Sequence, residues 1–192
     1  RSGTVDEPVR NAISKLSGYH LVATGESRER LIRMGEAPQR IFVTGAPGLD
    51  GLEADAAMDV QECRATLGLP KEGAFALVVF HPVVQQAGDA YAQTAAMLHA
   101  LGAVNLPVLW LEPNADAGSL EVLRALDALA LPSGSRRLRH LARPLFCAAM
   151  RHCAVMLGNS SAGIIEAASF GTPVVNVGDR QRLRERNANV TD

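Results

Sequence analysis

Short apolar runs alternate with amphipathic stretches along the whole chain. Within the runs nearly every residue is apolar, which is typical of strands that are buried on both faces of a parallel sheet. Between the runs, apolar residues recur at helical spacing, as Val9, Ile13 and Leu16 do. The pattern therefore predicts an α/β fold, in which a parallel sheet is covered by helices on both faces.

Glycine, proline and polar clusters mark the ends of these elements, with a turn at residues 45–48 and loops at 68–73 and 131–135. The predicted helices are residues 7–16, 26–34, 60–67, 91–101, 119–130, 144–151 and 163–170. The predicted strands are residues 20–23, 40–44, 75–80, 108–111, 139–141, 154–157 and 174–177.

The two ends of the chain do not fit a single complete domain. Residues 1–44 hold too few elements to form a core of their own, so we expect them to be the end of a preceding domain. Residues 45–192 then form a second domain, incomplete at its C-terminus, whose last residues, 180–192, are predicted to be a polar, basic tail with nothing to bury it. The chain also opens without Met, so we expect it to be part of a longer protein.

The overall composition excludes several classes of partner. The chain has 192 residues, 47% hydrophobic, and a net charge of −1, which gives no electrostatic basis for binding nucleic acid or an anionic membrane. No apolar run reaches the roughly 18 residues of a membrane span. The cluster Arg136, Arg137, Arg139 and Arg143 is predicted to form a solvated basic face.

The three cysteines, Cys63, Cys147 and Cys153, form no CxxC motif. Cys147 and Cys153 are flanked by apolar or helical sequence, so we expect buried, reduced thiols in a cytoplasmic protein.

The most informative segment is the loop at residues 158–166, which joins a predicted strand to a helix N-terminus. Unpaired backbone N–H groups at such a junction bind anions, Ser160 and Ser161 add hydroxyl donors, and Gly163 lets a phosphate approach the backbone. Glu166 can accept hydrogen bonds from a ribose. The alternative is a helix capped by Asn159 or Ser160, with Glu166 complementing the helix dipole.

Three further residues are candidates for binding or catalysis. His81 follows a predicted strand, where it can donate to phosphate or transfer a proton, or simply bond a backbone carbonyl. Asp6 lies at a helix start, where an acid ordinarily complements the helix dipole. Arg180 follows the last predicted strand, and its guanidinium suits a diphosphate.

Taken together, seven segments in one order along the chain resemble the UDP-N-acetylglucosamine 2-epimerase family, and more closely its hydrolysing branch of sialic acid synthesis. The segments are GTVDEPVRNAISKLS (3–17), RERLIRMGE (28–36), VTGAPGLD (43–50), FHP (80–82), NSSAGIIE (159–166), FGTPVVN (170–176) and GDRQ (178–181). The resemblance implies a GT-B fold, in which two Rossmann-like domains enclose the active site. Residues 1–44 would end the first domain, and residues 45–192 would form most of the second, UDP-binding domain.

The resemblance also implies roles for individual residues. Ser160 and Ser161 match diphosphate-binding positions, Glu166 matches the ribose-binding acid, and Arg180 would hold phosphate. His81 matches the family's active-site histidine. Two further matches are Asp6, at a second carboxylate position in a segment that closes over the sugar, and the loop Arg143-Pro144-Leu145-Phe146, which would cradle uracil.

The implied substrate is a UDP-sugar, and the implied reaction releases UDP by elimination to a 2-acetamidoglucal, to which water adds with inversion at C2. No metal or redox cofactor is implied, and the full-length protein is expected to be a homodimer. The family's catalytic Asp, a Glu and a basic residue precede the segment where this chain begins, so the chain alone is expected to be catalytically incomplete. The alternatives are a non-hydrolysing epimerase, a GT-B glycosyltransferase and a non-catalytic UDP-binding module.

Overall fold

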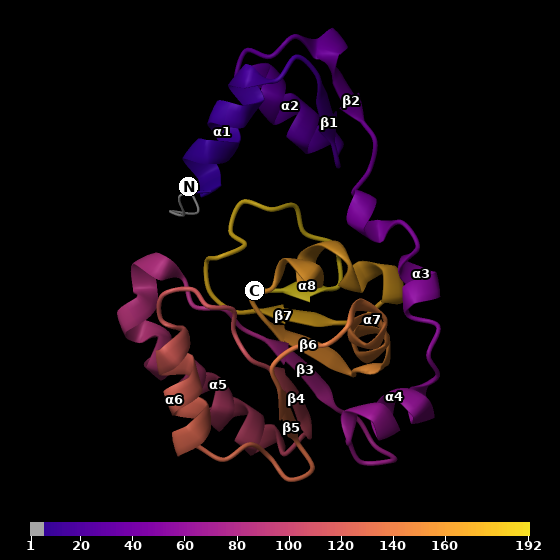
Figure 1. Cartoon of the computed structure of the whole chain (residues 1–192), viewed down its shortest axis with the longest axis vertical. Coiled ribbons are helices and arrows are strands. Elements are labelled where there is room, and N and C mark those ends of the chain that lie inside the picture. Colours follow the sequence, from indigo (N-terminus) through magenta and orange to yellow (C-terminus); the bar gives the residue numbers. More distant parts are fainter. Residues whose placement is uncertain (1–5) are drawn as a thin grey trace. The chain divides into compact units, whose positions relative to one another are not determined.

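The computed structural model describes residues 6–192, with side chains from Pro8 onward. The chain divides into two compact units, Arg1–Asp50 and Gly51–Asp192, which are described separately below. Both units combine helices with parallel strands (Figure 1).

The first unit is a small strand–helix–strand motif preceded by a helix. Its two strands are parallel, and Thr24 caps the helix between them by accepting a hydrogen bond from the Ser27 N–H at 3.1 Å. Its elements are α1 (Asp6–Leu16), β1 (His20–Val22), α2 (Gly25–Arg33) and β2 (Ile41–Val43), with 3-10 turns at Pro38–Arg40 and Pro47–Leu49.

Among the described residues of this first unit, only His20 and Ile41 are buried. Apolar side chains on α1 and on both strands are exposed, and Leu16 retains 87% of its accessible surface. Polar contacts connect its elements, since Glu36 accepts hydrogen bonds from Lys15 at 2.7 Å and from His20 at 3.2 Å. The first unit therefore has almost no apolar core of its own.

The second unit is built on a six-stranded sheet in which every neighbouring pair of strands is parallel. The strand order is β5-β4-β3-β6-β7-β8, the order of a Rossmann fold, which confirms the predicted fold class. The strands are β3 (Ala76–Val79), β4 (Val108–Leu111), β5 (Arg136–Leu138), β6 (Val155–Gly158), β7 (Val174–Asn176) and β8 (Val190–Thr191). The helices are α3 (Leu52–Asp55), α4 (Val60–Leu67), α5 (Ala90–Val104), α6 (Ser119–Ala128), α7 (Arg143–His152) and α8 (Ser161–Ile165), with 3-10 turns at Val84–Asp89 and Ala167–Phe170.

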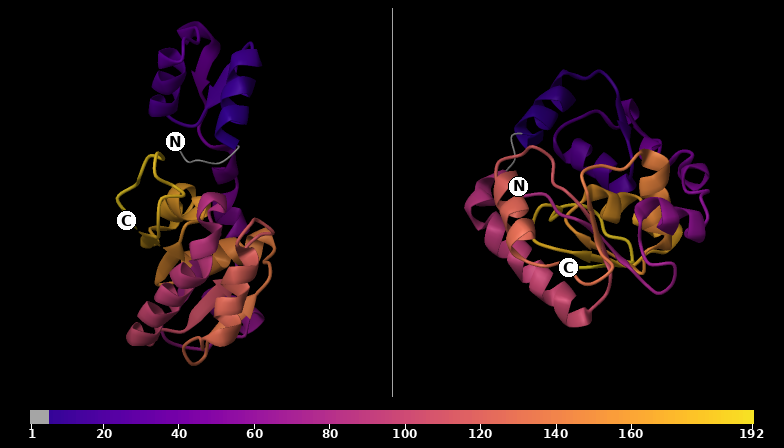
Figure 2. Two further views of the ribbon diagram at one scale, coloured as in Figure 1. Left: turned by 90° about the vertical axis from the view of Figure 1, so that its left-hand side faces the viewer. Right: turned by 60° about the horizontal axis from the view of Figure 1, so that its bottom comes forward.

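Helices cover both faces of this sheet (Figure 2). Alternate residues of the central strands supply two separate cores, one on each face. Leu77 and Val79 of β3 pack with α4 and α7, whereas Ala76 and Val78 pack with α5 and α6. Because a strand's side chains alternate between faces, a continuous apolar run is needed where both faces are covered. This explains why the apolar runs located β3, β4, β6 and β7 to within one or two residues.

Two predictions about the β5 region were wrong. The strand expected at residues 139–141 lies at Arg136–Leu138, where it pairs with β4 at the sheet edge. Nor do the four arginines there form one solvated face, because Arg137 contacts Glu112 at 2.7 Å and Asp127 at 2.5 Å. An edge strand that carries ion pairs has no apolar run to reveal it.

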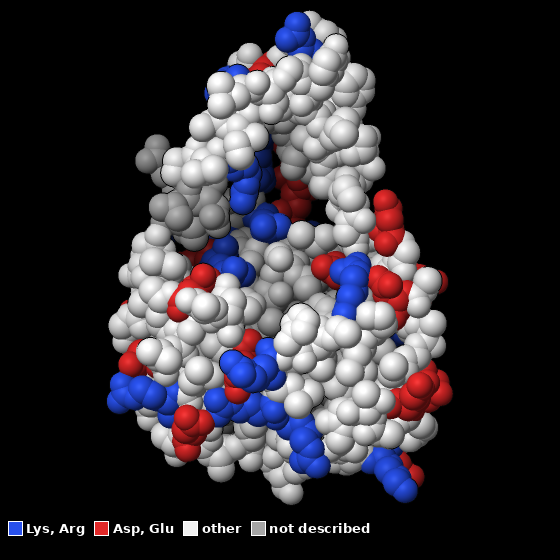
Figure 3. All heavy atoms as spheres, in the orientation of Figure 1, with Lys and Arg blue, Asp and Glu red and all other residues white. Residues whose placement is uncertain are grey.

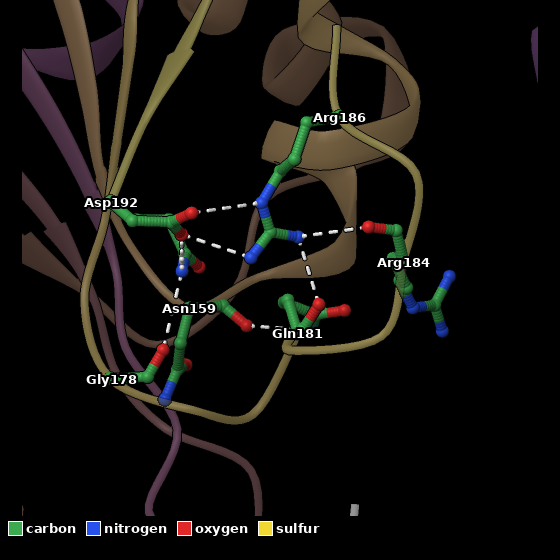
Figure 4. A network of polar contacts seen from close by, with 7 residues as sticks. Asn159, Gly178, Gln181, Arg184, Arg186 and Asp192 are labelled. Atoms are coloured by element: carbon green, nitrogen blue, oxygen red, sulfur yellow. Dashed lines mark hydrogen bonds and ion pairs between the residues drawn. The ribbon is translucent and has the colours of Figure 1, made fainter.

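The expectation of an unburied C-terminal tail was also wrong. Val190 and Thr191 form β8, which pairs with β7, and Val190 packs against the core. The Asp192 carboxylate accepts hydrogen bonds from Arg186 at 2.9 Å and from Asn176 at 2.6 Å (Figure 4). The segment is polar in sequence, yet it is fixed by hydrogen bonds to the end of the sheet.

The three cysteines are buried free thiols, as predicted. Burial raises the pKa of Cys63 to about 11 and that of Cys153 to about 12, so both thiols stay protonated near neutral pH.

None of the helices in the described part of the chain is long and apolar enough to cross a membrane.

Arg64 provides a first prediction, about stability. This buried guanidinium lies over the Phe75 ring, donates to the carbonyl of Pro70 at 2.7 Å and also bonds the carbonyl of Gly73. Replacing it with Met removes the donor of two partly buried hydrogen bonds and leaves a cavity beside the Phe75 ring, and a lost hydrogen bond of a charged group costs about 1.5–3 kcal/mol. We expect Arg64→Met to lower the free energy of unfolding by about 3 kcal/mol in urea titrations. Arg124→Met, at an exposed helical ion pair, should change it by less than about 0.5 kcal/mol.

Candidate nucleotide-binding site

The candidate site lies where β3 and β6 end side by side at the carboxyl edge of the sheet. The chain order reverses here, because β4 and β5 lie on one side of β3 while β6, β7 and β8 follow on the other. Open α/β sheets bind ligands at this topological switch point. His81 follows β3, and Asn159 follows β6.

Gly158, the last residue of β6, allows the two strands to meet closely. Its φ of +130° lies in a region that favours glycine, and a Cβ built there would lie 2.1 Å from the Val79 carbonyl oxygen. The next N–H, that of Asn159, donates to the same oxygen at 3.1 Å. Gly158 thus lets the loop at residues 159–161 begin directly against β3.

Asn159 is the centre of a hydrogen-bond network at this edge. Its side chain is almost fully buried, accepts from the His81 N–H at 2.8 Å and donates to the His81 carbonyl at 2.7 Å. Its carbonyl accepts from Arg180 at 3.1 Å and from Gln181 at 2.9 Å; Figure 4 labels Asn159 and Gln181. Asn159 therefore brings together His81 and Arg180, which are far apart in sequence. The sequence suggested Asn159 only as a helix cap, and we know of no sequence signal for this wider role.

The His81 ring is partly buried, and its environment favours the neutral form. Burial is the main cause that lowers the pKa of His81, followed by the positive charge of Arg180. The Asp116 carboxylate and the Asn114 side chain oppose this shift. The ring is therefore neutral at pH 7.

A second prediction follows for the titration of His81. Its midpoint should lie below the ordinary value of about 6.5 when followed by NMR of the ring. Arg180→Gln removes a repelling cation and should raise the midpoint, whereas Asp116→Asn removes an attracting anion and should lower it. Shifts in the opposite directions would contradict the assigned environment. Other ionisable side chains line the same pocket as His81 and are not substituted in these variants. They are Glu112, Arg139, His140 and Arg143.

The loop after Asn159 leads into a shorter helix than predicted. Ser160 is the N-cap of α8 and accepts from the Ala162 N–H at 3.3 Å. The helix has only five residues, so its end contributes local N–H donors rather than a long dipole. Gly163 is buried, and a Cβ there would lie 3.0 Å from Val174, so this glycine allows α8 to pack on β7. Phosphate approach at Gly163 stays a prediction.

Glu166 lies at the junction of α8 and the following 3-10 turn. One carboxylate oxygen, Oε2, is buried without a hydrogen-bond partner, and the Arg143 guanidinium is 3.5 Å from it in an ion pair. Burial, only partly offset by Arg143, raises the pKa of Glu166. A buried acceptor without a donor is unfavourable, and the hydroxyl groups of a ribose would satisfy it.

A pocket of about 410 Å³ opens at the same edge of the sheet. Its lining combines apolar residues from the ends of β3 and β4 with polar residues from the segment before α7. The lining residues are Val79, His81, Leu111, Glu112, Arg139, His140, Leu141, Arg143 and Phe146.

The segment from Arg143 to Phe146, which the resemblance describes as a loop, forms the first turn of α7, and this confirms the helix predicted at residues 144–151. Pro144 favours helix initiation there, and Ala142 provides no side-chain cap. This turn lines the pocket through Arg143 and Phe146.

Asp6 is the first residue of α1, and its side chain lies outside the described residues. It belongs to the first unit, so the structure does not relate it to His81 or to the pocket. Its catalytic role stays a prediction.

Charge on the second unit is mixed in sign. On the face seen in Figure 3, Lys and Arg side chains lie among Asp and Glu side chains. Among the residues that the structure describes, no group of three or more His, Cys, Asp or Glu side chains is arranged to hold a metal ion.

Comparison with known proteins identifies the family. The sequence model of the UDP-N-acetylglucosamine 2-epimerase family matches residues 1–191. The chain belongs to this family.

Curated members of the family match the whole length of the chain. It is 46% identical over 192 residues to the UDP-N,N'-diacetylbacillosamine 2-epimerase (hydrolyzing) of Legionella pneumophila, covering 100% of this chain and 51% of that protein. It is 34% identical to the UDP-N-acetylglucosamine 2-epimerase of Neisseria meningitidis, covering 98% of this chain and 50% of that protein. The chain therefore spans about half the length of the curated relatives it matches.

Solved structures of the family share the fold. The structure of the Neisseria meningitidis UDP-GlcNAc 2-epimerase bound to UDP-GlcNAc aligns with a TM-score of 0.72 and 15% identity, covering 86% of this chain and 46% of that one. At this identity the likeness establishes the fold alone.

Proposed function

We propose that this chain carries the UDP-binding part of a hydrolysing UDP-sugar 2-epimerase. The reaction converts UDP-N-acetylglucosamine and water to N-acetylmannosamine and UDP through a 2-acetamidoglucal, and a diacetamido UDP-sugar is the variant substrate. Family membership and the match to a hydrolysing relative support the reaction class. Residues 1–44 would end the N-terminal domain, and residues 45–192 would belong to the C-terminal domain.

The observation that carries this proposal is the junction at Asn159. The buried Asn159 side chain binds both backbone polar groups of His81, while the backbone carbonyl of Asn159 accepts from Arg180. Arg180 and His81 therefore meet at the switch point of the sheet, where the chain continues from Asn159 into Ser160 and Ser161. These are the donors that a diphosphate requires.

The parts of UDP can be assigned to separate residues around this junction. Arg180, Ser160 and Ser161 would bind the diphosphate, since a guanidinium has five N–H donors and Arg180 uses one on Asn159. Glu166 would accept hydrogen bonds from the ribose through Oε2, which is ion-paired with Arg143 at 3.5 Å but accepts no hydrogen bond from the described residues. The first turn of α7 and Phe146 would hold the uracil.

In the first step, UDP leaves C1 as a base removes the proton at C2. Negative charge then develops on the diphosphate, and fixed donors at that position lower the barrier because they need no reorganisation. Arg180 and the loop at residues 159–161 would provide this stabilisation. In the second step water adds to the 2-acetamidoglucal with inversion at C2, and Asp6 is the carboxylate that this chain would contribute to proton transfer.

The proposal is tested by product analysis with the intact protein that contains this chain. Incubation with UDP-N-acetylglucosamine, or with its diacetamido analogue, should release UDP and the free C2-epimeric sugar. Interconversion of two UDP-sugars without release of UDP would instead show a non-hydrolysing epimerase. Transfer of the sugar to an acceptor with C2 unchanged would show a glycosyltransferase. Turnover of neither sugar nucleotide, with UDP still bound, would show a binding module.

Two other features of the proposal, a homodimeric full-length protein and a role in sialic acid biosynthesis, rest on the resemblance alone. The proposed cytoplasmic location rests on the three free, buried cysteines.

A further inference from the structure

A second loop, residues 112–119 after β4, contacts the ring of His81 directly. The backbone N–H of Asn114 lies 3.3 Å from Nδ1 of that ring in hydrogen-bonding geometry. Nδ1 is thus the ring nitrogen of His81 that faces this N–H.

This contact selects one form of the neutral ring. A backbone N–H can only donate, so Nδ1 has to accept with its lone pair. A neutral imidazole carries one proton, which is then on Nε2. We propose that Asn114 is a positioning residue that holds His81 as the Nε2–H tautomer, so that the ring presents a hydrogen-bond donor to a ligand in the pocket.

The loop is built to hold this amide in place. The Ser119 hydroxyl lies within hydrogen-bonding distance of the carbonyl oxygens of Asn114 and Asp116, and the Asn114 side chain donates to the Asp116 carboxylate at 2.7 Å. Gly118 has a φ of +94°, and a Cβ there would lie 2.9 Å from Pro82. Glycine at this position therefore lets the loop lie against the residue that follows His81.

The His81 backbone is fixed independently. Asn159 binds its N–H and its carbonyl from the β6 side, while Asn114 binds its ring from the β4 side. The loops that follow β4 and β6, the two neighbours of β3, thus determine where His81 lies and which of its ring nitrogens carries the proton.

The tautomer limits what His81 can do. With the proton on Nε2, the ring can donate to an anionic oxygen, but Nε2 has no lone pair with which to remove a proton from a substrate. Of the charged groups around the ring, Arg180 favours the neutral form and Asp116 opposes it. The ionisable side chains that line the same pocket are Glu112, Arg139, His140 and Arg143. If the ligand is a UDP-sugar, as proposed above, His81 acts as a donor to it and the base is another group.

The tautomer can be measured without any ligand, by long-range ¹H–¹⁵N NMR on the 192-residue chain labelled with ¹⁵N-histidine. The spectrum is recorded above the His81 midpoint and assigned by loss of signals in His81→Gln. We expect a pyrrole-type Nε2 and a pyridine-type Nδ1 with the shift of a hydrogen-bonded acceptor. A protonated Nδ1 in the wild-type chain would overturn the proposal.

Two variants test whether Asn114 is the cause. Asn114→Pro removes the N–H and should move the tautomer ratio about fivefold toward Nδ1–H, the effect of losing one hydrogen bond of about 1 kcal/mol. Asn114→Gly retains the N–H but loses the side-chain bond to Asp116, so its ratio should lie closer to wild type than that of Asn114→Pro. A folded Asn114→Pro chain with unchanged His81 signals would overturn the proposal.

If Asn114→Pro does not fold, Ser119→Ala decides, since it loosens the loop without touching His81. It should shift the ratio in the same direction, whereas unchanged His81 signals would overturn the proposal. Ser135→Ala is its control, because that hydroxyl accepts from Val108 N–H at the opposite end of β4.

In the intact enzyme, Asn114→Pro should lower kcat more than it raises KM. An unchanged tautomer would refute this inference alone, whereas a wild-type enzyme without turnover would refute the proposed function alone.

Discussion

Gly158→Ala is expected to destabilise the protein by about 3 kcal/mol or more, the largest effect on stability that we predict. The alanine Cβ would lie 2.1 Å from the Val79 carbonyl oxygen and 2.7 Å from its carbonyl carbon, and both atoms are backbone at the centre of the sheet. Relief requires β6 to move away from β3, which breaks the hydrogen bond from Asn159 N–H to Val79. The free energy of unfolding, measured in urea, is the direct readout.

Gly171→Ala is the matched control. Gly171 also has a positive φ, +67°, but nothing lies within 4 Å of the position of its Cβ. It should therefore show only the conformational cost of a left-handed residue, about 1 kcal/mol. Equal losses in the two variants would mean that the close approach of β3 and β6 is not what requires glycine at 158.

Glu166→Ala is expected to weaken UDP binding by about 1–3 kcal/mol, or roughly 5- to 150-fold in Kd. The physical reason is the loss of charge-assisted hydrogen bonds from ribose hydroxyls to a carboxylate that has an unpartnered buried oxygen. Glu166→Gln retains one acceptor oxygen and should show a smaller loss. Isothermal titration with UDP measures both variants, and Glu62→Gln, an exposed glutamate on α4, is the control.

The stability of Glu166→Gln separates a binding role from a structural one. The folded state raises the pKa of Glu166, so the favourable contribution of this group is present below its unfolded pKa and is lost as the pH rises through the folded pKa. At pH 7 the buried charge is a cost, and its removal should leave Tm unchanged or higher. Lower Tm with unchanged UDP affinity would make Glu166 a structural residue.

The sheet was predictable because burial on both faces is visible in the sequence. Strands β3 and β4 are continuous apolar runs with all four residues buried, and their boundaries were expected to within two residues. The same apolar runs indicated that His81 and the loop at residues 158–166 follow strand ends. Open parallel sheets bind ligands at these carboxyl ends of their strands.

The edge strands that were misplaced or missed are held by polar groups, whereas α3 was missed because its four residues are too few to show a helical period. β5 lies at an edge and carries Arg136 and Arg137, and β8 depends on contacts such as Arg186 with Asp192. Asn159 and the 112–119 loop depend on pairings between strand ends that only the fold creates. A polar residue in sequence shows that a hydrogen bond is possible, but not which partner the fold supplies.

The measurement that tests the central claim most directly is isothermal titration of the 192-residue chain with UDP, with UMP and ADP as controls. The account predicts binding that prefers UDP over both controls, since UMP lacks the second phosphate for Arg180 and the serine loop, and ADP does not carry uracil. A chain shown to be folded by circular dichroism that binds none of the three, or all three equally, would contradict the assignment of this site to UDP.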